Sequence, residues 1–395
     1  MILRKKYLEQ LQLFKNKQVI KVITGIRRCG KSTLLQQFAD QLLVLGVSSD
    51  QIIHINFEDL KFENLLNYKT LYEYISSKLC KDKFTYIFLD EIQQVENFQK
   101  VVDSLYIKDN VDVYVTGSNS DLLSSELATL LTGRYVEISL LPLSFAEYMS
   151  AHNDIAPHDA FYDYVQSGGM PYALSMQTGL ARDIYLQGIY NTILVNDIFK
   201  RHGNTDMMVL ESILKYLLHN VGGLVSSTNI ANALASSGRK VSYNTVEKYI
   251  GYLTECFLLY EVKRYDVKGK QHLKSLAKYY VVDVGLRNTV LSNAATDSGH
   301  ILENIVYLEL LRRCRSVSVG KWENKEVDFV ATTEYGINYY QVAATILNQD
   351  TLERELTPFQ RIKDNYPKTV LTLDRIGLGD HDGIRILNVV DWLLN

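Results

Sequence analysis

The residues with the clearest chemistry form one short segment near the amino terminus, Gly25-Ile26-Arg27-Arg28-Cys29-Gly30-Lys31-Ser32-Thr33. It follows an apolar run at residues 19–23 and precedes apolar residues at helical spacing, from Leu34 to Leu42. A strand, a loop of the pattern G-x-x-x-x-G-K-[ST] and a helix in this order predict a phosphate-binding loop. The glycines allow a tight turn whose backbone N–H groups point at an anion, and the helix presents its positive end to the same anion.

Two side chains of this loop define the expected ligands. Lys31 is expected to bridge the β- and γ-phosphates of a nucleotide, and Ser32 is expected to give its hydroxyl to Mg²⁺. The segment therefore predicts ATP or ADP with Mg²⁺ as the ligands of this chain. The alternative interpretation is a glycine-containing loop that matches the pattern without binding phosphate.

Two adjacent carboxylates, Asp90 and Glu91, follow the apolar residues 86–89. A buried strand that delivers acids to the carboxyl edge of a sheet has this pattern. We expect Asp90 to hold Mg²⁺ through its water shell and Glu91 to act as the base that polarises the attacking water. The alternative is a strand that ends in a solvated acidic turn.

Further polar residues flank two later strands of the same region. Ser118 and Asn119 follow an apolar run at residues 111–116, where they could sense the γ-phosphate or orient the water, or equally cap a helix. Arg134 precedes a strand at residues 135–140. Its guanidinium could enter the nucleotide site of a neighbouring copy and stabilise transition-state charge, or cap the end of its own helix.

Composition narrows the class of protein. A length of 395 residues predicts two or three domains, and 47% hydrophobic with 22% charged residues is typical of a globular chain and excludes disorder. The net charge of −3 means that nucleic-acid binding would need a local basic patch. Four widely spaced cysteines indicate reduced thiols, and no apolar run is long enough to span a bilayer. We therefore expect a cytoplasmic protein.

The elements that must position these residues follow from the same region. The first 140 residues alternate strand and helix signals, which predicts an α/β fold with a parallel sheet covered by helices. Residues 51–57 have the pattern of a strand, and the segment around Leu71 and Leu79 that of a helix. The phosphate loop and the paired acids then both lie at strand ends.

These motifs resemble a family. GIRRCGKSTL, YIFLDEI, VTGSNS and LLTGRYVEISLLPLSFAEY are similar to stretches of the bacterial and archaeal AAA-type P-loop ATPases that carry a carboxy-terminal domain of unknown function. The resemblance implies a sheet in the order 5-1-4-3-2 with a helical lid after the last strand. It also implies a nucleotide-sensing role for Gly169 and Pro171 in the lid. Without the family, these residues indicate a turn with proline at a helix start.

The pattern changes at about residue 206. Three helices are expected, followed by strands at 258–264 and 279–283 that flank a polar turn with Lys268 and Lys270; the helices span residues 207–219, 228–236 and 242–256. Three helices and a basic hairpin fit a winged helix-turn-helix, which also resembles what this ATPase family carries.

This segment predicts a surface for double-stranded DNA. The third helix would show Tyr243, Asn244 and Lys248 to a major groove. The hairpin would add phosphate contacts from a group of basic residues, namely Lys263, Arg264, Lys268, Lys270, Lys274 and Lys278. The alternatives are a solvated polar hairpin, or a winged helix that binds a protein partner.

The last hundred residues resemble a restriction-endonuclease-like core. The resemblance assigns Glu303 on a helix at 300–313, Asp328 on a strand at 326–330, and a third strand at 338–343. The third element departs from the pattern, because Gln341 is neutral and Ala343 stands where a lysine belongs. Losing these charges removes metal ligation and anion stabilisation, so we expect no nuclease activity. Lys321 or Lys325 could reach in from the preceding strand.

The chain is thus expected to contain an ATPase core (1–140), a helical lid (141–205), a winged helix (206–285) and an inactive nuclease-like α/β domain (286–395). One functional hypothesis is an ATPase whose nucleotide cycle repositions the winged helix on DNA. The other is a nucleotide-dependent switch that acts through an unknown protein partner, with little hydrolysis and no DNA. An arginine acting in trans would require a homo-oligomer.

Overall fold

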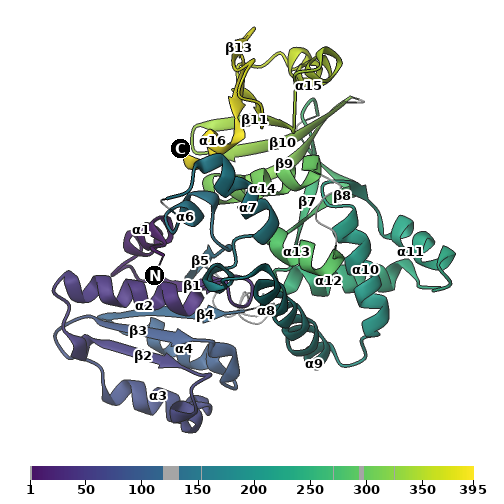
Figure 1. Ribbon diagram of the computed structural model, residues 1–395. Helices are drawn as coiled ribbons and strands as arrows, with labels where there is room; N and C mark the ends of the chain where they lie inside the picture. Colours follow the sequence, from purple (N-terminus) through teal and green to yellow (C-terminus); the bar gives the residue numbers. More distant parts are fainter. Residues whose placement is uncertain (1, 119–132, 153, 270, 293–297, 324) are drawn as a thin grey trace. The chain divides into compact units, whose positions relative to one another are not determined.

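The computed structural model describes residues 2–118, 133–152, 154–269, 271–292, 298–323 and 325–395 (Figure 1). The chain divides into two compact units. The first comprises Met1–Pro142 with Glu255–Phe257, and the second comprises Leu143–Thr254 with Leu258–Asn395. Within the described ranges, no helix is long and apolar enough to cross a membrane, and all four cysteines have free thiols.

The first unit contains a five-stranded parallel sheet in the order β2-β3-β4-β1-β5, which confirms the order that the family resemblance implied. Its strands are β1 (Ile20–Thr24), β2 (Ile52–Asn56), β3 (Thr85–Asp90), β4 (Val111–Gly117) and β5 (Tyr135–Ser139). Thr24 pairs with Gly117, and Asn56 pairs with Asp90. The ends of β1, β3 and β4 therefore meet at one edge of the sheet, which is where ligands bind in open α/β sheets.

Helices cover both faces of this sheet (Figure 1). On one face, the ring of Phe38 lies 5.3 Å from that of Tyr114 on β4. On the other, Leu71, Ile75 and Leu105 pack with the strands in a continuous apolar core. The helices are α1 (Lys5–Leu13), α2 (Lys31–Val44), α3 (Tyr68–Ser77) and α4 (Phe98–Tyr106), with short 3₁₀ segments at Ser49–Gln51, Leu60–Leu65 and Ile92–Gln94.

The second unit begins with helices. Those in its first part, up to residue 255, are α6 (Phe145–Met149), α7 (Pro157–Ser167), α8 (Gly179–Thr192), α9 (Lys200–His202), α10 (Met207–His219), α11 (Ser227–Ser236) and α12 (Tyr243–Glu255), with a 3₁₀ segment at Pro171–Ser175 and a π-helix at Ile193–Phe199. The three helices expected from the sequence between residues 207 and 256 correspond to α10, α11 and α12 within one residue at each end.

The strands of the second unit form a nine-stranded sheet in the order β13-β14-β12-β11-β10-β9-β7-β8-β6. The strands are β6 (Leu224–Val225), β7 (Leu259–Asp266), β8 (Gln271–Val281), β9 (Ser316–Trp322), β10 (Lys325–Thr333), β11 (Gly336–Ala343), β12 (Lys368–Thr372), β13 (Gly379–His381) and β14 (Ile384–Asn388). The helices α13 (Val284–Leu291), α14 (Ser298–Arg313), α15 (Gln349–Arg361) and α16 (Val389–Leu394) accompany it.

The hairpin of β7 and β8 differs from its sequence-based prediction. The second strand begins at Gln271, eight residues earlier than expected, because backbone pairing with β7 reaches from Val281 to Gln271 whatever the polarity of the side chains. The hairpin also joins the carboxy-terminal strands, since Arg264 on β7 pairs in parallel with Val319 on β9. The sheet therefore runs across the proposed division at residues 285/286, and the domain boundaries inside the second unit remain predictions.

Candidate functional site

The phosphate loop follows β1 and leads into α2. Gly25 has a φ of +146°, and a Cβ there would lie 2.2 Å from the carbonyl oxygen of Leu140. Gly30 has a φ of +104° and is the N-cap of α2. Both glycines are thus required by the backbone path. Cys29, fully buried between them, has a pKa raised by burial, so its thiol stays neutral and packs the loop.

Lys31 and Glu91 lie close together, as expected. The Lys31 side chain is 3% exposed, and its Nζ donates to the carbonyl oxygens of Gly25 at 3.0 Å and Ile26 at 3.4 Å. The same Nζ lies 3.6 Å from Glu91 Oε1. Ser32, in the first turn of α2, is exposed. The segments that follow β1 and β3 therefore place Lys31, Ser32 and Glu91 at the same edge of the sheet.

The other members of the loop have distinct environments. Ile26 is fully buried, whereas Arg28 is exposed in a left-handed conformation with a φ of +68°. Arg27 Nη1 lies 3.5 Å from Glu58 Oε1. Thr33 is exposed in the first turn of α2. The loop therefore anchors itself through buried side chains and exposes cationic and hydroxyl groups.

Asp90 ends β3 and is fully buried. Its Oδ1 accepts a hydrogen bond from Thr116 Oγ1 at 2.5 Å, whereas its Oδ2 is buried without a hydrogen-bond partner among the described residues. A buried carboxylate oxygen without a donor is costly unless it meets a cation or water. The chemistry of the Asp90 carboxylate and the Ser32 hydroxyl thus fits a divalent cation such as Mg²⁺.

Glu91 adopts a left-handed backbone conformation, with a φ of +55°. Its Oε2 accepts a hydrogen bond from Gln93 Nε2 at 2.5 Å, and its N–H donates to Thr116 Oγ1 at 2.9 Å. Sequence reasoning missed both Gln93 and Thr116. The signal for Thr116 was a polar residue at the end of the strand expected at residues 111–116.

The other residues expected near the nucleotide lie in different places. Ser118 directly follows β4, is 2% exposed and lies at the carboxyl edge of the sheet. Asn119 lies outside the described residues. Arg134 precedes β5 at the opposite edge, where its carbonyl accepts from the N–H of Ile20 at 2.8 Å. Its guanidinium pairs with Asp103. Arg134 therefore points away from the phosphate loop of its own chain, and its action in trans stays a prediction.

The glycines of the expected lid motif are held inside the second unit. Gly168 has a φ of +71°, and Gly169 N donates to Asp283 Oδ2 at 2.6 Å. Pro171 begins a 3₁₀ segment, as a proline at a helix start should. Burial raises the pKa of Asp283, the N-cap of α13, to about 6. The turn at Gly168 and Gly169 thus packs against Asp283 at the start of α13, and the nucleotide-sensing role of Gly169 and Pro171 stays a prediction.

The expected DNA-facing residues of α12 form an exposed face. Tyr243 is 53% exposed, and Asn244 and Lys248 are exposed on the same helix. In the hairpin, Lys268 is exposed, and its Nζ lies 3.0 Å from Glu323 Oε1. Lys270 lies outside the described residues. The three α12 residues are therefore exposed, as the DNA prediction requires, whereas Lys268 of the hairpin is already paired with an acid, and contact with DNA stays a prediction.

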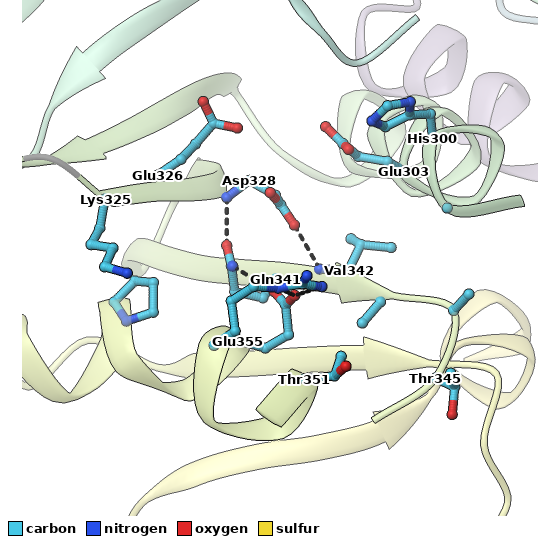
Figure 2. Close-up of a pocket in the computed structure, with 15 residues that line it drawn as sticks. His300, Glu303, Lys325, Glu326, Asp328, Gln341, Val342, Thr345, Thr351 and Glu355 are labelled. Atoms are coloured by element: carbon cyan, nitrogen blue, oxygen red, sulfur yellow. Dashed lines mark hydrogen bonds and ion pairs between the residues drawn. The ribbon is translucent and has the colours of Figure 1, made fainter. Parts of the chain in front are cut away.

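A polar cavity of about 620 Å³ lies in the carboxy-terminal part of the second unit (Figure 2). Glu303 on α14, Asp328 on β10, Gln341 on β11 and Glu355 on α15 line it. Gln341 Oε1 accepts from the N–H of Asp328 at 2.6 Å, and its Nε2 donates to Glu355 Oε2 at 2.8 Å. Residues of α14, β10 and β11 thus meet at this cavity, and the restriction-endonuclease-like character of this part stays a prediction. No sequence signal had indicated the acid on α15.

Lys278 corrects the prediction for the hairpin. It was expected to face DNA, but its side chain is 4% exposed, and its Nζ lies 2.8 Å from Glu303 Oε1 and 2.7 Å from Glu326 Oε1. Burial alone would lower the pKa of Lys278, but the neighbouring carboxylates, Glu303 foremost, outweigh burial and raise it. The side chain of Lys278 faces inward because the carboxylates of Glu303, which is buried, and Glu326, which is half-buried, compensate its charge.

The donor set of this cavity does not fit a metal. Glu303 Oε1 already binds the Lys278 ammonium and accepts from Tyr280 OH at 2.5 Å. Burial, and then the charge of Glu303, raise the pKa of Asp328 well above its ordinary value. Lys325 lines the cavity and Lys321 is not among its lining residues. The cation that faces Glu303 is Lys278, from β8. The absence of nuclease activity stays a prediction.

Comparisons with known proteins agree with this geometry. A family model described as an AAA domain matches residues 17–149, and a model of a domain of unknown function, DUF8612, matches residues 158–297. An uncharacterized protein of Haemophilus influenzae is 42% identical over 100% of this chain and 99% of its own length. One of Methanocaldococcus jannaschii is 31% identical over 93% and 82%, respectively. Among solved structures, a Walker-type ATPase of Pyrococcus abyssi matches with a TM-score of 0.52 and 15% identity, over 73% of this chain and 96% of that one.

Proposed function

Because this chain belongs to the AAA-type P-loop ATPases that carry a domain of unknown function, we propose that it binds ATP with Mg²⁺ and hydrolyses it to ADP and phosphate. One observation carries the proposal. The ammonium of Lys31 and the carboxylate of Glu91 lie 3.6 Å apart at the sheet edge where Asp90 Oδ2 is buried without a donor from the described residues. A nucleotide with its cation satisfies all three groups.

The residues have separate tasks in this reaction. The backbone N–H groups of the loop and the positive end of α2 bind the phosphates. Lys31 exchanges the carbonyls of Gly25 and Ile26 for phosphate oxygens when the nucleotide binds. Glu91 orients the attacking water and accepts its proton. Ser32 and Asp90 would hold Mg²⁺, which would supply positive charge to neutralise the phosphates.

Steady-state phosphate release and nucleotide binding test this function. Lys31→Ala should lose nucleotide binding, whereas Glu91→Gln should keep binding and lose about 10²- to 10⁴-fold in turnover, because it keeps the shape of the base but not its basicity. Lys69→Ala, an exposed lysine on α3, is the matched control and should keep both properties. Wild-type turnover in Glu91→Gln would refute the role of this carboxylate.

We include DNA as the output of the nucleotide cycle. Three helices, α10, α11 and α12, precede a hairpin, and the last helix exposes Tyr243, Asn244 and Lys248. An exposed aromatic, an amide and a cation on one helix are the side chains that read base edges and phosphates. Support from the hairpin is smaller than the sequence indicated, because Lys278 is buried.

Binding of the full chain to duplex DNA tests this output at several salt concentrations, with and without ATP. Lys248→Glu should weaken binding at least about 10-fold and lower the salt slope, because a phosphate contact becomes repulsive. Lys215→Glu, an equivalent change on the exposed side of α10, should bind as wild type does. Equal binding by both variants, or no binding by wild type at low salt, would refute DNA contact through α12.

The alternative output is a contact with a protein partner, in which the chain acts as a slow nucleotide-dependent switch. The pairing of Lys268 with Glu323 and the burial of Lys278 favour it, because both reduce the positive charge available to phosphates. This alternative predicts co-purified ADP, slow turnover and no effect of DNA. DNA-stimulated hydrolysis would exclude it.

Arg134 belongs to the proposal as a residue that acts in trans within a homo-oligomer. The support is its place at the amino edge of the sheet, away from the phosphate loop of its own chain. Lys31→Ala and Arg134→Ala proteins should each be inactive, and mixing them should restore turnover, because the intact site of one meets the arginine of the other. Failure of every mixing ratio to restore turnover would remove Arg134 from the site.

A further inference from the structure

Thr116 has an unusual place between the two acids of the candidate ATPase site. It lies on β4, is fully buried, and its hydroxyl is the donor to Asp90 Oδ1 at 2.5 Å. Thr116 Oγ1 also accepts a hydrogen bond from the backbone N–H of Glu91 at 2.9 Å. One hydroxyl thus uses its donor on the last residue of β3 and an acceptor site on the residue that follows it.

The bond to Asp90 selects which carboxylate oxygen remains available. Oδ1 is occupied by the threonine hydroxyl, and Oδ2 is the buried oxygen that has no hydrogen-bond donor within the described ranges. Donation to one oxygen also fixes the rotation of the carboxylate plane. Thr116 therefore leaves Asp90 with a single free oxygen, in a fixed direction, for a cation or its water shell.

The bond to Glu91 stabilises the turn after β3. Glu91 has a φ of +55°, a conformation that costs about 1 kcal/mol or more for a residue with a side chain. This turn takes Glu91 out of the strand alternation, and its Oε1 lies 3.6 Å from Lys31 Nζ. The hydroxyl of Thr116 offsets part of the strain by satisfying the N–H at that turn.

We propose that Thr116 is a positioning residue for ATP hydrolysis, whose single hydroxyl orients Asp90 toward the cation and Glu91 toward the attacking water. The inference rests on the proposed ATPase function. Thr116 acts through the two acids and does not touch the nucleotide. Threonine suits this role because its branched Cβ restricts χ1 and favours a strand, so the hydroxyl keeps one direction.

Two substitutions separate the hydroxyl from the packing. Thr116→Val keeps the shape of the side chain and removes the hydroxyl, which leaves Asp90 Oδ1 and the N–H of Glu91 without this partner. Thr116→Ser keeps the hydroxyl and removes the methyl group. Thr85→Val is the matched control, because Thr85 is also fully buried and its hydroxyl accepts from the N–H of Cys80 at 3.0 Å, at the other end of β3.

The measurements are kcat, KM for ATP and the Mg²⁺ concentration that gives half-maximal turnover. We expect Thr116→Val to lower kcat about 10- to 100-fold and to raise the Mg²⁺ requirement, with KM nearly unchanged, because misplaced acids affect the reacting atoms more than binding. Thr116→Ser should stay within about 3-fold of wild type, and Thr85→Val should keep the wild-type Mg²⁺ requirement.

Two results would overturn the inference. One is Thr116→Val with the kcat and Mg²⁺ requirement of wild type. The other is Thr116→Ser as impaired as Thr116→Val, which would assign the effect to the methyl group. A fluorescent ADP analogue gives a readout without turnover, since Thr116→Val should need a higher Mg²⁺ concentration to reach the Mg²⁺-dependent gain in ADP affinity. If wild type does not hydrolyse ATP, the proposed function fails, and this binding measurement alone then decides the role of Thr116.

Discussion

The buried ion cluster around Lys278 offers the sharpest test of how the second unit is held together. Lys278→Met keeps the length and apolar stem of the side chain and removes its charge. Glu303, whose side chain is 8% exposed, then keeps the Tyr280 hydroxyl and loses the ammonium at 2.8 Å. An uncompensated carboxylate remains between the hairpin strand β8 and α14, where water cannot solvate it well.

The size of the effect follows from burial. Removing one partner of a buried ion pair costs about 3–5 kcal/mol. Glu326 is 32% exposed, so its share is below about 1 kcal/mol. We therefore expect Lys278→Met to lower the free energy of unfolding of the second unit by about 3–5 kcal/mol at pH 7. With a slope of about 3 kcal/mol per molar urea, the midpoint falls by at least about 1 M.

Intrinsic fluorescence is a selective assay for this prediction. Both tryptophans of the chain, Trp322 and Trp392, belong to the second unit, so their emission follows the unfolding of that unit. Lys325→Met is the matched control, because Lys325 is exposed and lines the same cavity. Its midpoint should match that of wild type, since surface substitutions change stability by about 0.5 kcal/mol or less.

A double variant separates the charge from the packing. Lys278→Met with Glu303→Gln leaves no uncompensated charge at the pair and should recover most of the loss, which a double-mutant cycle reports as a coupling energy. A Lys278→Met midpoint equal to that of the Lys325→Met control would refute the reasoning. A double variant no more stable than the single one would show that the stem of Lys278, and not its charge, supports the sheet.

Three further changes test other parts of the fold. Asp112→Asn removes the charge that faces the fully buried Lys21 in the first unit, so the free energy of unfolding of that unit should fall by about 3–5 kcal/mol. The amides of β1 and β4 should then exchange hydrogen faster, and unchanged exchange would contradict this. Gly168→Ala forces a side chain into a φ of +71° and puts its Cβ 2.3 Å from Asp283 Oδ1. The free energy of unfolding, measured by tryptophan fluorescence, should therefore fall by about 2 kcal/mol or more. An unchanged unfolding midpoint would show that the turn accommodates a side chain. Burial raises the pKa of Asp283 to about 6 from its ordinary 3.8, so its protonated form stabilises the folded state fully below about pH 4, and this stability is lost as the pH rises through 6. Asp283→Asn should remove that decline, and parallel wild-type and variant stability profiles between pH 4 and 7 would refute it.

The nucleotide site shows what local sequence can determine. The phosphate loop lies within nine consecutive residues, and the acids directly end an apolar strand. Backbone turn, helix start and strand end are decided by neighbours in the chain, so residue type and spacing suffice to predict them. The order of the five strands followed from the family resemblance.

Tertiary structure decided which distant side chains meet. Thr116 lies 26 residues from Asp90, and Lys278 lies 25 residues from Glu303. No local pattern reports such pairs, because they depend on strand register and on which acids a lysine finds when it is buried. The same limit explains the hairpin, whose basic side chains indicated an exposed wing although its backbone extends a nine-stranded sheet. The backbone path of the loop and the place of the two acids at a strand end could thus be predicted from the sequence, whereas the residues that hydrogen-bond to these acids depended on the packed sheet.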